Sequence, residues 1–509
     1  MKTFSVKMTA GLLIVTAAGA QTSLWADPAT SLPAPTPWGV VERGAHHNVW
    51  ERTVYEPGPN GTVVGKLHRY TELATGLNYR DRQSGQWRPS QEEIDLLPAG
   101  GAYAAAAVAG QHQVYFPGDI YSGVMTLVTP DGRELSSRPV GLFYEDDRNS
   151  VLIAVLTNSV GERLGSNQVI YPQAFEGAEA SIRYTYTKAG LEQDILVQAQ
   201  LPAPESYGLD PARTRLEVLT EFLDTNRPVE TTAAVNPPDG LSDVTLTFGK
   251  MKMTRGRAFL IGKPSGSPGG GEGRGQGATP TCKRWLNLKG RHFLLEEVPY
   301  SKVAPQLDQL PPATGRVKRV QTNLLAGNSI LNKVSARRLL PPARRVQASA
   351  WRKMQVAQTD LSPKRSFVLD YVTLNSSLTN YVFQGDTTYY LTGPVIISGT
   401  TTLEGGTVIK FAPGAGAKLS VDQLICRTGP YRPAVLTARD DNTVGETISG
   451  STGVPSGFYA SRALEVNNTT GIGTTVTNLR IAYAATAFYD LGEYDPYQTD
   501  SARDVQLVR

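Results

Sequence analysis

The sequence predicts an all-β protein with two unlike β-rich regions and a basic linker between them. Three observations support this fold class. Glycine and proline are abundant, with 50 and 34 residues, which favours turns over long helices. Apolar and polar residues alternate with period two through the first half of the chain, and short β-branched runs recur between turn residues near its end. A chain of 509 residues is long enough for roughly two to four domains.

The amino terminus has the layout of a secretory signal peptide. Lys2 and Lys7 precede an apolar stretch from Ala10 to Ala20, which is too short to span a bilayer, and small residues follow with cleavage expected after Ala20 or Ala26. A buried N-terminal helix is the alternative. We therefore expect residues 1–26 to be removed and the mature chain, without a transmembrane segment, to be secreted to the extracellular space or the cell surface.

A Pro-rich lead over residues 27–47 is followed by a predicted β-sandwich-like domain over residues 48–300. In "SIRYTYTKAGLEQDILVQAQ", Ile182, Tyr184 and Tyr186 fall on one strand face, and a turn leads into a second alternating run, which is a hairpin pattern. Many short strands with one apolar face must stack against a second sheet or close on themselves, so a sandwich or distorted barrel is expected. The glycine-rich run 265–280 is expected to be a loop between two strands.

The composition changes in the predicted linker, residues 301–385. Lys and Arg number 13 between Ser301 and Ser366, against only Asp308 and Asp360. Such an excess of positive charge could attract an anionic polymer, with an affinity that falls steeply with salt. The alternative is a solvated connector that self-repulsion keeps extended.

Residues 386–509 are predicted to form stacked coils of a parallel β-solenoid. The segment "YYLTGPVIISGTTTLEGGTVIKFAPG" and the runs after it place adjacent β-branched residues between Gly, Thr, Asn and Asp, with connecting loops of unequal length. The final "DVQLVR" has the pattern of another strand. We therefore expect the solenoid to be incomplete at Arg509 and to continue in a longer protein.

This segment resembles the first rungs of right-handed parallel β-helix proteins secreted by bacteria, the pectin-lyase-like class, in which an opening rung leads into a strand like "GTVIKF". The resemblance covers about a fifth of the chain and implies fold more than activity. The region 48–300, with "HQVYFPGDIYSGVMTLVTPDGRELSSRPVGLFY", is similar to the leader domain of long uncharacterised secreted bacterial proteins, which implies no activity.

The best candidates for catalysis are Asp440, Asp441 and Glu446 in "ARDDNTVGE", directly after the apolar run "AVLTA". Paired carboxylates at a strand end suit the acid/base cleavage of glycosidic bonds. The resemblance implies that some β-helix glycosidases carry such a pair, but their Gly-His-Gly and Arg-x-Lys elements are absent here, and no histidine follows His292. Asp and Asn also serve as turn residues, which is the competing interpretation.

Metal binding has weaker support. The carboxylate pairs Asp146/Asp147 and Asp440/Asp441 could hold Ca²⁺, the only cofactor considered, although the first pair also fits a hairpin turn. The adjacent His46 and His47 would point to opposite strand faces, which argues against a shared metal. The two cysteines, Cys282 and Cys426, are expected to be unpaired thiols in different domains.

Nucleotide chemistry is not expected, because phosphate-loop spacing, a G-x-S-x-G elbow and an H-E-x-x-H motif are all missing. The formal charge of +4 is too small to indicate a nucleic-acid partner by itself. We therefore expect a secreted, non-enzymatic adhesion-type protein whose β-helix contacts a polysaccharide or cell-surface glycan. The alternative is a polysaccharide lyase or glycoside hydrolase that uses the acidic residues on the helix face.

Overall fold

The structure, a computed structural model, is mostly β-strand with a single α-helix, α1 (Tyr300–Leu307), among the described residues. Those residues are 32–147, 149–223, 227–232, 243–253, 256–261, 278–314, 353–357, 366–414, 416–467, 473–490 and 501–508. The predicted signal peptide, most of the glycine-rich run and most of the basic linker lie outside them. None of the helices in this part of the chain has the length and apolar character needed to cross a membrane.

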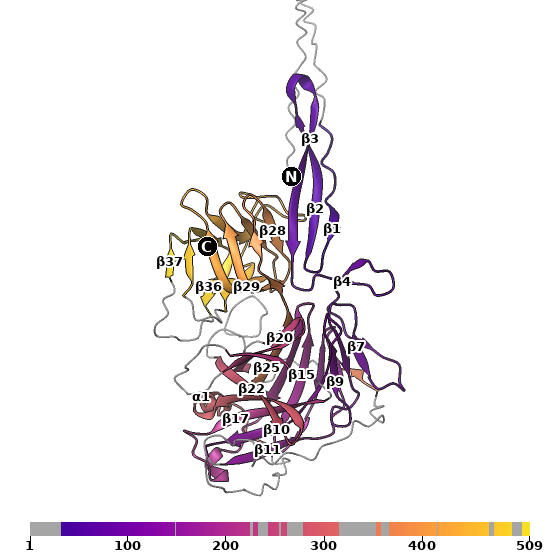
Figure 1. Ribbon diagram of the computed structural model, residues 1–509, viewed down its shortest axis with the longest axis vertical. Helices are drawn as coiled ribbons and strands as arrows, with labels where there is room; N and C mark the ends of the chain where they lie inside the picture. The colour runs from indigo at the N-terminus through magenta and orange to yellow at the C-terminus, as the bar shows by residue number, and fades with distance from the viewer. Residues whose placement is uncertain are drawn as a thin grey trace, which may run out of the picture. The chain divides into compact units, whose positions relative to one another are not determined.

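Eight strands between residues 95 and 299 form one sheet of antiparallel neighbours (Figure 1). Its strands, in spatial order, are β6 (Asp95–Leu96), β7 (Ala105–Ala107), β8 (Gln113–Phe116), β9 (Met125–Val128), β10 (Glu134–Glu145), β17 (Arg215–Leu223), β23 (Arg291–Pro299) and β22 (Thr279–Leu288). The hairpin partner of β10 is β11 (Ser150–Leu156), which also pairs with β14 (Phe175–Glu176).

A second sheet faces the same core. It contains β24 (Gln355–Val356), β12 (Glu162–Leu164), β13 (Gln168–Tyr171), β15 (Ala180–Tyr186), β16 (Gly190–Val197) and β25 (Ser366–Ser376), and β25 also pairs with β20 (Met251–Met253) and β21 (Gly256–Ile261). Beyond β20 lie β19 (Val244–Phe248) and β18 (Val229–Thr232). Because β21 also pairs with β22, the two sheets join into a closed, barrel-like arrangement rather than two separate layers.

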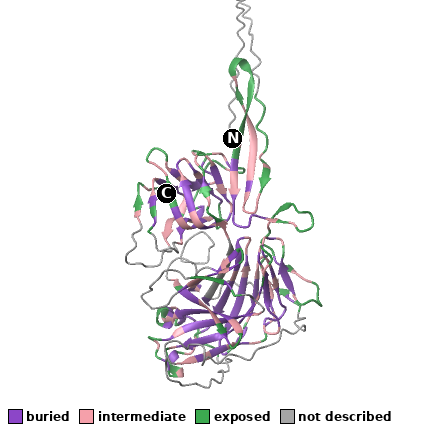
Figure 2. Cartoon of the chain, in the orientation of Figure 1, coloured by how far each residue is buried: buried purple, intermediate pink, exposed green. Residues whose placement is uncertain are grey.

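The period-two pattern explains how this barrel is filled. The predicted hairpin is confirmed as β15 and β16, and Ile182, Tyr184 and Tyr186 are all buried in the main apolar core. Figure 2 shows the barrel strands mostly as buried residues, with exposed residues concentrated in the connections. Alternation with one apolar face therefore predicted the strands, while the closure between the sheets required pairings between distant segments.

The described parts of the predicted linker 301–385 differ from an extended connector. Helix α1 packs on the barrel, with Val303 and Leu307 in its core. Strand β25 lies between β16 and the strands β20 and β21. The reason is local. Just after the last basic pair, the apolar residues Phe367, Val368 and Leu369 are buried in a strand. The charge count over the whole segment averaged across this short apolar run, so the strand was not predicted.

An antiparallel ribbon is formed by β1 (Gly39–Arg43), β2 (His47–Pro57) and β3 (Val63–Leu73). Residues 52–67 and the described residues before Trp38 form a compact unit of their own, in which the backbone N–H of Thr36 donates to the carbonyl of Thr53 at 2.9 Å. The tip of this ribbon is exposed in Figure 2.

The last part of the chain alternates between two parallel sheets. One contains β28 (Thr388–Leu391), β30 (Val408–Phe411), β32 (Ala434–Ala438), β35 (Leu479–Ala482) and β38 (Gln506–Val508). The other contains β26 (Leu378–Thr379), β29 (Pro394–Glu404), β31 (Lys418–Arg427), β33 (Ala460–Val466) and β36 (Ala484–Asp490), with β27 (Val382–Phe383) also on β29. A smaller parallel pair joins β34 (Thr475–Thr477) and β37 (Ser501–Arg503).

Aliphatic side chains stack inside this parallel region, as the short apolar runs predicted. Ile409, Phe411 and Leu436 on the first sheet and Leu419 and Leu464 on the second belong to one buried cluster. The end of β3 belongs here too, since residues 71–73 pair in parallel with residues 389–391 of β28. A segment assigned by sequence to the first domain therefore supplies a strand to the second.

Candidate functional site

The predicted acidic cluster lies in the turn-rich segment that follows β32. Asp440 and Asp441 are 3 % and 7 % exposed, so both carboxyl groups are buried. Tyr459 donates its hydroxyl to Asp440 Oδ2, the backbone N–H of Thr452 donates to Oδ1 at 2.7 Å, and the Arg439 guanidinium is 3.1 Å from Oδ1. Burial opposes ionisation, but these donors together hold the pKa of Asp440 below its usual value.

Asp441 is satisfied in a different way. Its Oδ2 accepts from the Thr437 hydroxyl at 2.7 Å, and its Oδ1 accepts from the backbone and the hydroxyl of Thr443. These bonds hold the pKa of Asp441 below its usual value against the effect of burial. The neighbouring Lys410 ammonium is fully buried and donates to the backbone carbonyls of Asp441 and Glu446, at 2.7 Å each. Burial lowers the pKa of Lys410 to about 8.

Glu446 makes different contacts from those of the two aspartates. Its Oε2 is 2.7 Å from His68 Nδ1 on β3, and its backbone N–H donates to the Thr388 hydroxyl at 2.9 Å. The segment after β32 is thus fixed onto the outer face of the parallel sheet by buried polar contacts. Because both aspartates are enclosed and already accept several hydrogen bonds, the geometry favours a structural role, and catalysis by this cluster stays a prediction.

The other candidates are dispersed. Asp146 accepts from the backbone N–H of Asn149 at 2.6 Å in the β10–β11 turn, whereas Asp147 forms an exposed ion pair with the distant Arg213. Across the described ranges, no group of three or more His, Cys, Asp or Glu side chains is arranged to hold a metal ion. In the same ranges no disulfide joins Cys282, which is buried, to Cys426.

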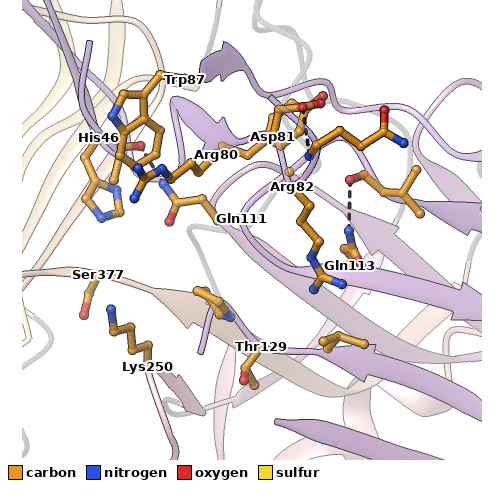
Figure 3. Close-up of a pocket in the computed structure, with 17 residues that line it drawn as sticks. His46, Arg80, Asp81, Arg82, Trp87, Gln111, Gln113, Thr129, Lys250 and Ser377 are labelled. Atoms are coloured by element: carbon orange, nitrogen blue, oxygen red, sulfur yellow. Dashed lines mark hydrogen bonds between the residues drawn. The ribbon is translucent and has the colours of Figure 1, made fainter. Parts of the chain in front are cut away.

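The described residues also form a groove of about 810 Å³ that the sequence did not indicate. We call it the basic groove. Its polar and aromatic lining residues include His46, Tyr79, Arg80, Asp81, Arg82, Trp87, Gln111, Gln113, Lys250 and Ser377. Figure 3 shows Trp87, His46 and Gln111 along one side of the space, with Lys250, Ser377 and Thr129 across from them.

A short hairpin of β4 (Asn78–Arg80) and β5 (Trp87–Pro89) carries much of this lining. Its turn is closed by Asp81, whose Oδ1 accepts from the backbone N–H and the hydroxyl of Ser84, at 2.7 Å each. The hydrogen bond from the Ser84 backbone is the main cause of the lowered pKa of Asp81. This carboxylate therefore stays ionised, and its Oδ2 lies 3.6 Å from Arg88 Nε on the same hairpin.

The base of the hairpin is anchored by Asn78, which is fully buried and donates to the carbonyl of Gly44 at 2.7 Å and to Asn48 Oδ1 at 2.9 Å. Gln111 donates its amide N–H to the carbonyls of Ala45 and Asn78, at 2.6 and 2.9 Å. Both amide nitrogens are therefore used to fix loops, so the groove wall is preorganised before any ligand arrives.

His46 adds a fixed donor. Its Nδ1 accepts the backbone N–H of Gly76 at 2.9 Å, and this assigns the ring proton of the neutral form to Nε2. Burial lowers the pKa of His46 to about 4, with smaller contributions from His47 and Lys250, so the ring is neutral at pH 7. Among the described residues neither the Arg82 guanidinium nor the Lys250 ammonium has a carboxylate partner, so both cations are available to a ligand.

Sequence reasoning considered His46 only as half of an adjacent pair and missed the rest of the groove. Its residues come from six segments, near positions 46, 79–87, 108–113, 128–130, 250 and 377, and no spacing motif connects them. The available signal was the run "YRDRQSGQWRP", in which arginines and aromatic residues surround a turn.

No family model, no curated protein and no solved structure matches this chain.

Proposed function

We propose that this chain is a secreted, non-catalytic adhesion-type protein that binds an acidic polysaccharide in the basic groove. We propose further that its parallel sheets are the first turns of a right-handed β-helix that serves as a scaffold. The alternation of the chain between two parallel sheets supports the second statement, because each return to the first sheet adds one strand to the stack.

The observation that supports an acidic polysaccharide as the ligand is that aromatic faces and unpaired cations surround one preorganised groove. Trp87 is 37 % exposed and Tyr79 is partly exposed, and such rings offer flat apolar surfaces to the C–H faces of sugars. Arg82 and Lys250 supply positive charge, and an arginine binds a carboxylate through two parallel hydrogen bonds. A polymer of uronic acids or sulfated sugars presents both kinds of surface.

The test is retention of the purified full chain on immobilised polygalacturonate, alginate and a neutral glucan at low salt. We expect retention on the acidic polymers, weakening as salt is raised. Trp87→Ala and Arg82→Ala should each weaken binding about tenfold. Tyr431→Ala and Arg427→Ala, at an exposed tyrosine and an exposed arginine outside the groove, are the matched controls.

Equal retention on neutral glucan, or loss of binding in the control variants, would contradict the proposal. So would equally tight binding of single-stranded DNA, which would indicate a general polyanion surface. The same polymers should be assayed for release of reducing sugar or unsaturated product. Turnover that is lost in Asp441→Asn would favour the enzymatic alternative.

A further inference from the structure

A lysine and two carboxyl groups lie together in the interior of the barrel. Lys283 on β22 is the direct register partner of Glu296 on β23, and both side chains lie on the face that also carries Trp285 and Leu294. Asp243 immediately precedes β19 and reaches the same place. The three side chains are 1 %, 2 % and 4 % exposed for Lys283, Glu296 and Asp243.

The amine and one carboxyl group are in contact. Lys283 Nζ is 3.0 Å from Asp243 Oδ1 and 3.1 Å from Oδ2, and the backbone N–H of Lys283 also donates to Oδ1 at 3.0 Å. The Asp243 carboxyl group is therefore held in one orientation against the amine. Such enforced contact raises the effective concentration of the two groups far above that of a bimolecular reaction.

Glu296 is the unusual member. Its Oε2 is buried and has no hydrogen-bond partner. Burial raises the pKa of Glu296 to about 8, an effect that Lys283 opposes and Asp243 reinforces. The raised pKa favours the protonated form of this carboxyl group, and its strand position is directly opposite Lys283, so it is placed to exchange a proton with its neighbours. A salt bridge alone would not require a second buried carboxyl group, and a protonated one lacks the charge to strengthen it.

We propose that Lys283 and Asp243 form an intramolecular amide bond, and that Glu296 shuttles the protons. In the neutral pair, the lysine Nζ attacks Cγ of Asp243 while Glu296 protonates a carboxyl oxygen. The amine then loses a proton to Glu296. The remaining hydroxyl group gives its proton to the leaving oxygen as the C–O bond breaks, and one water molecule leaves. The ammonium and carboxylate of the pair thus become one amide and one water, Glu296 is regenerated, and no oxidant or cofactor is needed.

Intact mass spectrometry of the purified full chain tests the proposal directly. The wild-type chain should be lighter by one water than its sequence requires, with Lys283→Arg and Asp243→Ala as references that cannot form the bond. A protease digest should contain one branched peptide that joins Lys283 to Asp243. This inference does not depend on the proposed glycan binding, since neither mass nor digest involves a ligand.

The wild-type measurement decides the matter even where a variant fails to fold. A wild-type chain with its full mass would overturn the proposal, and a branch between Lys283 and Glu296 would overturn the assignment of the partner. The Glu296→Gln variant should have the full mass that its sequence requires, because the bond should not form without the proton shuttle. If this variant were also lighter by one water, Glu296 would not be the proton shuttle. Lys410→Arg, at a second buried lysine, should leave the mass deficit unchanged.

Discussion

Both the barrel and the parallel region bury a lysine, but they satisfy it differently. Lys410 in the parallel region gives its protons to two backbone carbonyls, beside aspartates that accept from hydroxyl and backbone donors. Lys283 in the barrel faces two carboxyl groups, one of which has an oxygen without a partner. The first environment pairs the ammonium with two neutral acceptors, while the second combines an ion pair with a buried carboxyl oxygen that has no hydrogen-bond partner, and groups of this kind are candidates for reactivity.

The largest expected effect comes from breaking the barrel site. Lys283→Met would leave Asp243 and Glu296 buried without their cation, so we expect the barrel to lose about 3–5 kcal/mol of stability. Hydrogen exchange read peptide by peptide would measure this as faster exchange in β22 and β23. Unchanged exchange there would show that the lysine is not energetically coupled to the core.

Lys410→Met should cost somewhat less, about 3 kcal/mol, because the partners left behind are neutral carbonyls rather than carboxylates. The same exchange measurement should show the effect in the segment after β32 and in β30. The exposed Lys66, whose side chain is 61 % exposed, provides a control, since Lys66→Met should change stability by at most about 0.5 kcal/mol. If Lys410→Met accelerated hydrogen exchange in the barrel as much as in β30, the two regions would not be independent in stability.

Acid should loosen the two regions in different pH windows. Burial lowers the pKa of His112 in the barrel to about 4, so the unfolded state takes up protons first and stability falls as pH drops from 6.5 towards 4. Lys418 and Arg462 overcome burial and lower the pKa of Glu465 in the parallel region to about 2, so its contribution is lost only between pH 4.5 and 2. Each effect is on the order of 3 kcal/mol.

Hydrogen exchange at stepwise lower pH, corrected for the intrinsic rate, would show which region opens first. His112→Gln should flatten the response of the barrel, and Glu465→Gln that of the parallel region. If both regions opened in the same window, these two groups would not control their acid stability.

The smallest expected effect concerns the acidic cluster. Tyr459→Phe removes one hydroxyl donor from Asp440 but leaves Arg439 and Thr452, so we expect a loss of about 1.5 kcal/mol. A thermal shift relative to the wild type would measure it. If Asp440 were catalytic rather than structural, the variant would instead change turnover with little change in stability.

The sequence predicted local strands better than their partners. Alternation identified the strand face with Tyr184 and Tyr186, because side-chain direction in a strand follows from spacing alone. The short apolar runs identified the strands that contain Ile409 and Leu436, both of which are buried in the structure. Pairing depends on contacts between distant segments. The β21–β22 junction and the strand at Phe367 therefore could not be recognised, the latter because basic residues directly precede it.

The candidate sites divide in the same way. Asp440 and Asp441 were found because they are adjacent in sequence. Adjacency did not reveal that the hydroxyl groups of Thr437 and Tyr459 donate hydrogen bonds to their carboxylates. Asp243 is separated from Lys283 by 40 positions, and Lys250 from His46 by far more. A groove or a buried triad of this kind requires the folded chain.

The pairing of β3 with β28 has a kinetic consequence. Thr392 contacts Glu72 across 320 positions of sequence. The end of β3 at Leu73 can therefore pair with β28 only after about 320 further residues have been synthesised. Closing so long a loop is slow, and the strand edge stays available to other chains in the meantime. The hairpins of the barrel, such as β15–β16 and β22–β23, need no such late partner and are expected to form before the stack acquires this first layer.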